Sequence, residues 1–231
     1  MIYGKGFIAK AFKKYKKNNS FIFFASGVSN SLEIKSHRYN KEINLLNKVI
    51  SYKNLSRTFI YFSTCSVCDP AKKNSLYVKH KLKIEKIIKK NCKNYFIFRL
   101  PNVIGDRHNG HTLVNSFLHK LKNNKKIEIL SGVNRNLIDI KDVVKIVDNI
   151  LKYEKKAKII NIANFYSNKV LDIVLYLGRI YSIKPNLQKK KNPVRFNYKI
   201  NINDIKKYIT LSKIKFSKSY YKKVINKYYG K

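Results

Sequence analysis

The sequence predicts a Rossmann-like α/β fold, in which a doubly wound, mostly parallel sheet is covered by helices on both faces. Two observations support this class. Continuous apolar runs of strand length alternate with segments whose apolar residues recur every three or four positions, the spacing of a helix. Most of their consecutive positions are apolar, as expected of parallel strands that are buried on both faces.

The N-terminal part of the chain alternates strand and helix. Strands are expected at residues 2–3, 21–25, 59–63 and 96–100, and Pro101 ends the last of them. Helices are expected between them, at residues 7–15, 39–50 and 78–88. The spacing of the second helix predicts one buried face made of Tyr39, Ile43, Leu46 and Ile50.

The remaining chain continues the alternation with shorter elements. We expect helices at residues 113–121 and 143–151, and strands at residues 127–130, 137–140 and 159–162. Ser167 is the expected N-cap of a last helix, and the lysine-rich residues 188–192 are expected to form a loop. We divide the chain into a dinucleotide-binding core, residues 1–165, and a small substrate-side region, residues 166–231, packed on it as one globular unit.

The apolar pattern argues against a membrane or secreted protein. No window holds the roughly 18 consecutive apolar residues of a membrane helix, so no membrane span is expected. The first residues, MIYGKGFIAKAFKK, lack the apolar core and the cleavage site of a secretory signal. Three cysteines, an odd number, also fit a reducing compartment. We therefore expect a cytoplasmic protein.

Charge is the most extreme feature of the composition. The chain has 51 Lys and Arg residues against 12 Asp and Glu residues, a formal net charge of +39. Only seven of the cations are arginine, whose two-pronged donor suits phosphate, and the lysines are spread along the whole chain. Two interpretations stay open. AT-rich codons favour Lys, Asn, Ile, Tyr and Phe regardless of function, or the lysines form a surface for a polyanion such as RNA or a membrane surface.

A glycine-rich turn opens the predicted fold. The motif GKGFIA at residues 4–9 follows a strand and begins a helix, which is the context of a dinucleotide fingerprint. Gly4 would permit the tight bend, Gly6 would let a pyrophosphate approach the backbone, and Ala9 is small enough for close helix packing. The alternative is a basic amphipathic presequence or surface helix.

Tyr77 and Lys81 form a second candidate motif, at the start of a helix. Their spacing of four places the phenol and the ammonium on one helix face. A free tyrosine, with a pKa near ~10, is a poor base at neutral pH, and a nearby cation favours its phenolate. Chance also produces this spacing in a chain so rich in tyrosine and lysine. Thr64 follows a predicted strand, and ligands of open parallel sheets bind beyond the carboxyl ends of the strands.

Three segments together resemble one family. GKGFIA at residues 4–9, STCSVC at 63–68 and YVKHK at 77–81 have the order and the element types of the extended short-chain dehydrogenase/reductases, in a shortened form. This is the NAD-dependent epimerase/dehydratase group, which acts on nucleotide sugars. Residues 99–105 resemble the strand and loop after the active-site helix, and residues 135–143 resemble the family's Arg-Asp-x-x-x-x-x-Asp-Val segment.

The resemblance implies an NAD(P)-dependent oxidoreductase or epimerase of surface-polysaccharide synthesis. Tyr77 would be the acid/base for a substrate hydroxyl or keto group, Lys81 would support it and hold the nicotinamide ribose, and Thr64 would hydrogen-bond the reacting oxygen. Asn102 and Arg135 would face the nucleotide sugar, with Arg135 near the diphosphate. The cofactor, NAD or NADP, would contact Lys81 and also Gly4, Gly6, Phe7, Ile8, Ala25, Ser26 and Gly27. A homodimer through the helices that flank the sheet is implied as well.

The sequence departs from the family in its cofactor half. About 20 residues past the glycines an acidic side chain should meet the adenosine ribose, but residues 25–30 read ASGVSN. This stretch resembles the loop after the family's fourth strand, as though the second and third strands were skipped. The choice between NAD and NADP therefore stays open. No acid stands at residues 65 and 66, beside Thr64, which favours reduction or epimerisation over dehydration.

Other chemistries have weaker patterns. Cys65 and Cys68 form a CxxC pair, so a dithiol oxidoreductase is one alternative. No second cysteine pair completes a zinc site, and His80, His108 and His111 lack ligand spacing, so no metal is expected and solvated loops are expected for these histidines. The main alternative to an enzyme is a non-catalytic Rossmann-like protein that binds a polyanion through its lysines.

Overall fold

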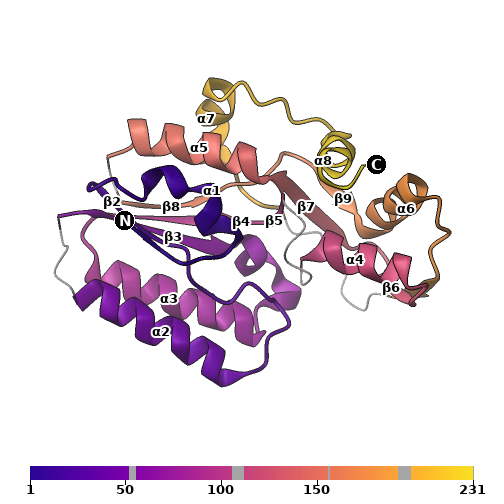
Figure 1. Ribbon diagram of the computed structural model, residues 1–231, viewed down its shortest axis with the longest axis horizontal. Coiled ribbons are helices and arrows are strands. Elements are labelled where there is room, and N and C mark those ends of the chain that lie inside the picture. The colour runs from indigo at the N-terminus through magenta and orange to yellow at the C-terminus, as the bar shows by residue number, and fades with distance from the viewer. Residues whose placement is uncertain (52–55, 106–111, 156, 192–198, 231) are drawn as a thin grey trace.

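The central feature of the computed structural model is a five-stranded parallel sheet (Figure 1). The structure describes residues 1–51, 56–105, 112–155, 157–191 and 199–230. The strand order is β1-β2-β3-β4-β8, with bounds β1 (Ile2–Tyr3), β2 (Phe21–Phe24), β3 (Thr58–Thr64), β4 (Tyr95–Leu100) and β8 (Lys158–Asn161). The predicted Rossmann-like α/β class is confirmed.

Helices cover both faces of this sheet. In Figure 1, α1 (Phe7–Ala11) and α5 (Ile140–Tyr153) lie above it, and α2 (Ser36–Ser51) and α3 (Leu76–Asn91) lie below it. Alternating side chains of β3 explain why both faces are apolar. Ile60 and Phe62 pack in the cluster that contains the apolar face of α5, whereas Phe59 and Tyr61 pack in the cluster with α2 and α3.

β1 is an edge strand of the sheet in the described part of the chain. Each later strand of the sheet is added on the same side of the one before it, so the order has no reversal. The crossovers through α2 and α3 pass over one face, and the crossover through α1 passes over the other. Two crossovers that lead to the same side of the sheet have opposite hands when they pass over opposite faces. The β1-to-β2 connection therefore has the opposite hand to the β2-to-β3 and β3-to-β4 connections.

A second group of elements packs beside the carboxyl ends of the central strands. β7 (Asn134–Asp139) pairs with β5 (Asn102–Ile104) and β9 (Ser167–Lys169), and β6 (Ile127–Leu130) pairs with β10 (Leu187–Lys190). A separate apolar cluster joins them to three helices: α4 (Leu113–Lys122), α6 (Val170–Tyr181) and α8 (Tyr220–Tyr229). α7 (Lys206–Leu211) returns to the central sheet and packs against α5. Four short 3-10 turns complete the part of the chain that the structure describes: η1 (Lys13–Tyr15), η2 (Cys65–Cys68), η3 (Pro70–Lys72) and η4 (Asn203–Ile205).

Three local predictions are corrected. Ser167 does not cap α6; it pairs with Asn136 in β9, and Lys169 occupies the N-cap position. The predicted lysine-rich loop begins inside β10, which pairs with β6 at an edge where lysine side chains stay exposed. The buried face of α2 is also shifted, because the fully buried positions are Tyr39, Glu42, Leu46 and Val49.

Hydrogen bonds fasten the C-terminal helix to the middle of the chain. Tyr220 of α8 donates to a carboxylate oxygen of Asp142 at 2.6 Å and accepts from the backbone N–H of Asp139 at 3.0 Å. Lys227 and Tyr228 both bind the Asp139 carboxylate. α8 therefore fixes the junction between β7 and α5.

Helices of the described residues are too short or too polar to cross a membrane. The division at residue 165 remains a prediction, as do the homodimer and the cytoplasmic location. The apolar clusters do not follow that division, because α4 and β6 precede it and pack in one cluster with α6 and α8.

Candidate active site

The residues predicted to bind the cofactor meet at the carboxyl ends of β1 and β2. Ala25 donates its N–H to the Tyr3 carbonyl at 2.8 Å, so the two strand ends lie side by side. Gly4 has φ +131°, and a Cβ there would stand 2.4 Å from the Ala25 carbonyl oxygen. This turn therefore requires glycine. Gly6, with φ −78°, has no atom within 4 Å of where its Cβ would be, which leaves open space beside the turn.

The two apolar residues of the glycine motif have a different position. The Phe7 ring lies against Gly105, where a Cβ would approach the ring to 2.4 Å. Ile8 also packs against the central apolar cluster. Both side chains are half-buried against this cluster.

Thr64 ends β3 and is buried. Its side-chain oxygen accepts the Ser66 N–H at 3.1 Å and so caps η2. Thr64 pairs in register with Leu100 of β4. The hydroxyl therefore stands on a fixed backbone at the carboxyl edge of the sheet.

Tyr77 and Lys81 lie together on the first turns of α3. Ser75 caps this helix by accepting the Val78 N–H at 3.3 Å. The Lys81 Nζ is 5.8 Å from the centre of the Tyr77 ring, which is half-buried, and Lys81 itself is 4% exposed. The predicted phenol and ammonium thus face the same side of the helix.

Glu42 is the functional-site residue that sequence reasoning missed. Its Oε1 accepts from Lys81 Nζ at 3.1 Å and from the Tyr61 hydroxyl at 3.0 Å. Its Oε2 accepts from His80 Nε2 at 2.8 Å and from the Val28 N–H at 2.9 Å. Four donors therefore surround one buried carboxylate next to the Tyr77–Lys81 pair.

The Glu42 carboxylate stays ionised in this setting. Burial by itself would raise its pKa, but the Lys81 ammonium, the His80 hydrogen bond and the Val28 N–H outweigh burial and hold the pKa of Glu42 at about 2. Lys81 also donates to the Tyr61 hydroxyl at 3.0 Å. An ammonium has three donors, so one N–H of Lys81 remains for a ligand.

Glu42 occupies a position on the apolar face of α2, and a carboxylate on an apolar face is the signal that could have revealed it. It lies three residues after Tyr39 and four before Leu46, both of which are buried. His80 corrects a further prediction, because it is buried in α3, with its ring 4.6 Å from that of Tyr39, instead of lying in a solvated loop. His108 and His111 lie outside the described residues.

A second buried carboxylate fixes the strands beneath the site. Glu85, one turn after Lys81, accepts from Ser63 at 2.6 Å and from the Arg99 guanidinium at 2.9 and 2.6 Å. Because Ser63 is in β3 and Arg99 is in β4, this network holds α3 against both strand ends. It stabilises the position of the helix that carries Tyr77.

The residues predicted to bind substrate lie on the neighbouring three-stranded sheet. Asn102 follows β4 and donates its side-chain amide to the Asn136 carbonyl at 3.0 Å, next to Arg135. Arg135 is half-buried and donates one guanidinium hydrogen to the Asn134 carbonyl at 3.0 Å. Burial and the Arg135 charge lower the pKa of Lys72, against the opposing effect of Asp69. Two cations, Lys72 and Arg135, therefore lie near each other on this side.

The surroundings of Cys65 and Cys68 disfavour a reactive thiol pair. Cys65 is buried, and its thiol donates to the Arg99 carbonyl at 3.1 Å. Burial raises the pKa of both Cys65 and Cys68, which disfavours the thiolate that redox chemistry needs. Within the described ranges, no group of His, Cys, Asp and Glu side chains could hold a metal ion.

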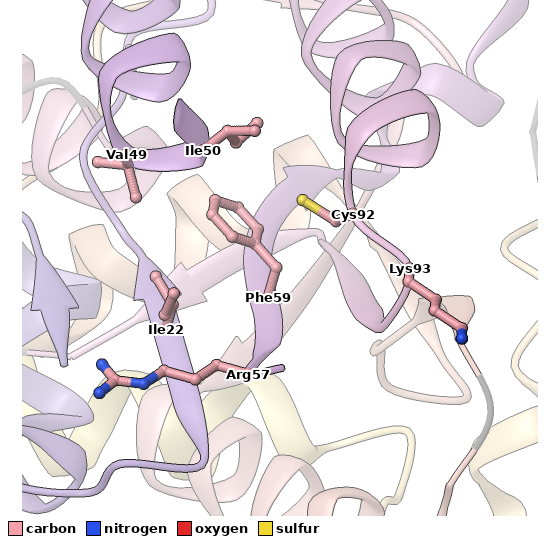
Figure 2. A pocket seen from close by; sticks show the side chains of 7 residues that line it. All are labelled: Ile22, Val49, Ile50, Arg57, Phe59, Cys92 and Lys93. Atoms are coloured by element: carbon pink, nitrogen blue, oxygen red, sulfur yellow. The ribbon is translucent and has the colours of Figure 1, made fainter. Parts of the chain in front are cut away.

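A small pocket lies at the opposite end of the strands (Figure 2). It has a volume of about 20 Å³, and Figure 2 shows Phe59 among the side chains that line it: Ile22, Val49, Ile50, Arg57, Phe59, Cys92 and Lys93. Burial raises the pKa of Cys92 to about 11. Its size suits about one water molecule and not a nucleotide.

Comparison with known proteins identifies a matching family. The family described as the NAD dependent epimerase/dehydratase family matches residues 8–163. These residues include Thr64, Tyr77, Lys81 and both predicted substrate residues. A curated relative, Protein Ycf2 of Physcomitrium patens, is 27% identical over 212 residues. That match takes in 82% of this chain but 8% of the relative, so the chain spans a small part of that protein's length.

Solved structures share the fold at low identity. The structure of RMD from Pseudomonas aeruginosa, complexed with NADPH, has a TM-score of 0.69 at 14% identity and covers 94% of this chain and 92% of its own. UDP-glucuronic acid 4-epimerase from Bacillus cereus, with UDP-glucuronic acid and NAD, has a TM-score of 0.68 at 20% identity, with coverages of 96% and 79%. UDP-N-acetylglucosamine 4-epimerase from Methanobrevibacter ruminantium has a TM-score of 0.67 at 17% identity, with coverages of 92% and 76%.

Proposed function

Because this chain belongs to the NAD-dependent epimerase/dehydratase family, we propose that it oxidises or reduces a nucleotide-linked sugar with a nicotinamide nucleotide. The observation that carries the proposal is the Tyr77–Lys81 pair, with Nζ 5.8 Å from the ring centre on the first turns of α3. The similar structure of RMD was solved with NADPH, and that of UDP-glucuronic acid 4-epimerase with UDP-glucuronic acid and NAD. The structure of UDP-N-acetylglucosamine 4-epimerase was solved with UDP-N-acetylmuramic acid.

Tyr77 would exchange a proton with the reacting sugar oxygen. Its half-buried phenol is the group of the site that both faces Lys81 and reaches solvent. Thr64, fixed at the end of β3, would hydrogen-bond the same oxygen and orient it. A bound nicotinamide would supply or accept the hydride. The residues of the chain then contribute orientation and proton transfer.

Lys81 fits the nicotinamide end of such a cofactor. Glu42 and Tyr61 fix two of its donors, and the third is left for a ribose hydroxyl. The backbone at Gly27 lies directly against the Glu42 carboxylate, since a Cβ there would be 2.5 Å from Oε1. The loop that follows β2 and the ammonium therefore share one carboxylate as their support.

Arg135 and Lys72 would bind the diphosphate of the sugar nucleotide. Their charges lie near each other, and the described residues offer Arg135 no carboxylate partner. A dianionic diphosphate satisfies two cations better than one. Asn102, whose amide donates to the Asn136 carbonyl, would lie between the diphosphate-binding cations and Thr64. Since Cys65 and Ser66 offer no acid beside Thr64, reduction or epimerisation is proposed over dehydration.

A panel experiment tests this function. UDP-, dTDP- and GDP-linked sugars, with and without a 4-keto group, are incubated with the full chain and NAD, NADH or NADPH, and both sugar products and nicotinamide absorbance are followed. We expect conversion of at least one sugar, and loss of that conversion in Arg135→Gln through a raised KM. Absence of conversion across the panel, together with absence of nicotinamide nucleotide binding, would overturn the proposal.

The net charge of +39 favours a second candidate, binding of a polyanion by a non-catalytic chain. Affinity for RNA or anionic vesicles should then fall steeply with salt, since each neutralised phosphate releases counterions. A flat salt response would remove this candidate.

A further inference from the structure

We propose that the chain holds a nicotinamide nucleotide by its nicotinamide, ribose and phosphate half, and that the adenosine half adds little to binding. This inference rests on the proposed function and specifies its ligand as a mononucleotide-type site. The usual dinucleotide-binding sheet has two halves, which meet where the strand order reverses, and each half binds one mononucleotide.

The strand order provides one half of that arrangement. β1 is followed on one side by β2, β3, β4 and β8, and on its other side no strand of the described residues pairs with it. Residues 4–20 connect β1 to β2, and they contain α1 and η1 without a further strand. The sheet therefore has no reversal at which a complete dinucleotide would lie across two halves.

The crossover through α1 points to the same conclusion. With α1 on its observed face, a crossover of the same hand as those through α2 and α3 would lead to the outer side of β1. That is where the second half of a dinucleotide-binding sheet would stand. After α1 the chain instead enters β2, on the inner side of β1. The helix α1 therefore covers the face that it would cover in a sheet with two halves, but residues 4–20, which connect β1 to β2, contain no outer strand.

The acidic partner of the adenosine ribose is also missing. Ala25, Ser26 and Gly27 follow β2 at the expected distance from the glycines, and none can accept from a ribose diol through a carboxylate. Glu33, the next acid, is occupied. Its carboxylate accepts from Ile34 N–H at 3.2 Å, from Lys35 N–H at 3.0 Å and from Arg38 at 2.6 Å.

The groups that would bind the nicotinamide, its ribose and its phosphate, in contrast, are present. Tyr77, Lys81 and Thr64 lie at the ends of β3 and α3, and Gly6 leaves open space beside the turn after β1. A ligand anchored there ends near its first phosphate. Because Ala25, Ser26 and Gly27 have no side chain that would distinguish a 2′-phosphate from a 2′-hydroxyl at the far end, NADH and NADPH should bind alike.

Calorimetric titration of the full chain with NADH, NADPH and reduced nicotinamide mononucleotide tests the inference. We expect the three dissociation constants to agree within about threefold, a difference of roughly 0.7 kcal/mol, and ADP-ribose not to compete. A dissociation constant for NADH more than about tenfold below that of the mononucleotide would overturn the inference and leave the proposed function standing. No binding of any of the three would overturn both.

Two variants separate the halves of the ligand. Gly6→Leu places a side chain in the open space at a position with an ordinary φ, so the fold should persist while affinity for NADH and for the mononucleotide falls equally, by at least about tenfold. Glu33→Gln should leave NADH affinity unchanged. A selective loss of NADH binding in Glu33→Gln would show that adenosine is bound after all.

Discussion

Glu42 and Lys81 form a buried ion pair, with Nζ 3.1 Å from Oε1 and each residue 4% exposed. The pair joins α2 to α3 directly beside the β2 and β3 strand ends. It fixes the ammonium one helical turn from Tyr77 and balances its charge within the site. The position of Lys81 therefore depends on a residue from a different helix.

Breaking this pair from either side should destabilise the fold. Glu42→Gln leaves the buried Lys81 ammonium without its counter-charge, and Lys81→Met leaves the buried Glu42 carboxylate without its counter-charge. Each variant should lower the free energy of unfolding by about 3–5 kcal/mol. The double variant should lose less than the sum by more than about 1 kcal/mol. Urea unfolding at neutral pH measures all three. Additive losses would show that the two charges do not interact.

Acid should remove the contribution of Glu42. Its pKa is about 2 in the folded protein, below the ordinary value of 4.5, so its stabilisation is fully present above pH 4.5 and is lost as pH falls towards 2. The linked free energy is roughly 3 kcal/mol. Unfolding free energy measured from pH 5 to pH 2.5 should fall more steeply in the wild type than in Glu42→Gln. Parallel curves would contradict the assignment.

The turn after β1 should tolerate substitution at one glycine and not at the other. Gly4→Ala forces a Cβ to within 2.4 Å of the Ala25 carbonyl at a positive φ, and should cost at least about 1–3 kcal/mol. Gly6→Ala is the matched control, because its φ is −78° and its surroundings are open. Thermal unfolding compares the two. Equal melting temperatures would mean that the turn can relax around Gly4.

Tyr220→Phe should loosen the C-terminal helix. The hydroxyl donates to Asp142 and accepts from the Asp139 N–H, so its removal leaves buried polar groups without this partner. We expect a loss of roughly 1–3 kcal/mol, and faster hydrogen exchange at α8 than at α3. Tyr181→Phe, which removes a single hydrogen bond to the Tyr229 carbonyl, is the control. Equal exchange at α8 in the two variants would contradict this role.

The central strands and helices could be predicted because their signal is local. Phe21 to Phe24 and Phe96 to Phe98 are apolar at consecutive positions, and such runs become buried wherever they occur. Tyr77 and Lys81 are also related by local spacing. β9 and β10 could not be predicted, because polar residues such as Ser167 and Lys189 become strand only through pairing with distant segments.

The carboxylate of the site could not be predicted for a related reason. Glu42 and Lys81 are 39 residues apart, and their contact depends on how α2 and α3 pack on the sheet. No spacing rule within one helix joins them. Within the described residues no strand pairs with the outer side of β1. The sequence indicated this in part, because residues 25–30 lack an acid and resemble the loop after a later strand of the family.

Substitution of Tyr77 tests the central claim most directly. Turnover of the converted nucleotide sugar is measured in Tyr77→Phe and in Tyr153→Phe, a half-exposed tyrosine on α5, together with NADH affinity. The account predicts at least a ~100-fold loss of turnover for Tyr77→Phe with NADH affinity within about twofold, and no change for Tyr153→Phe. Undiminished turnover in Tyr77→Phe would contradict it.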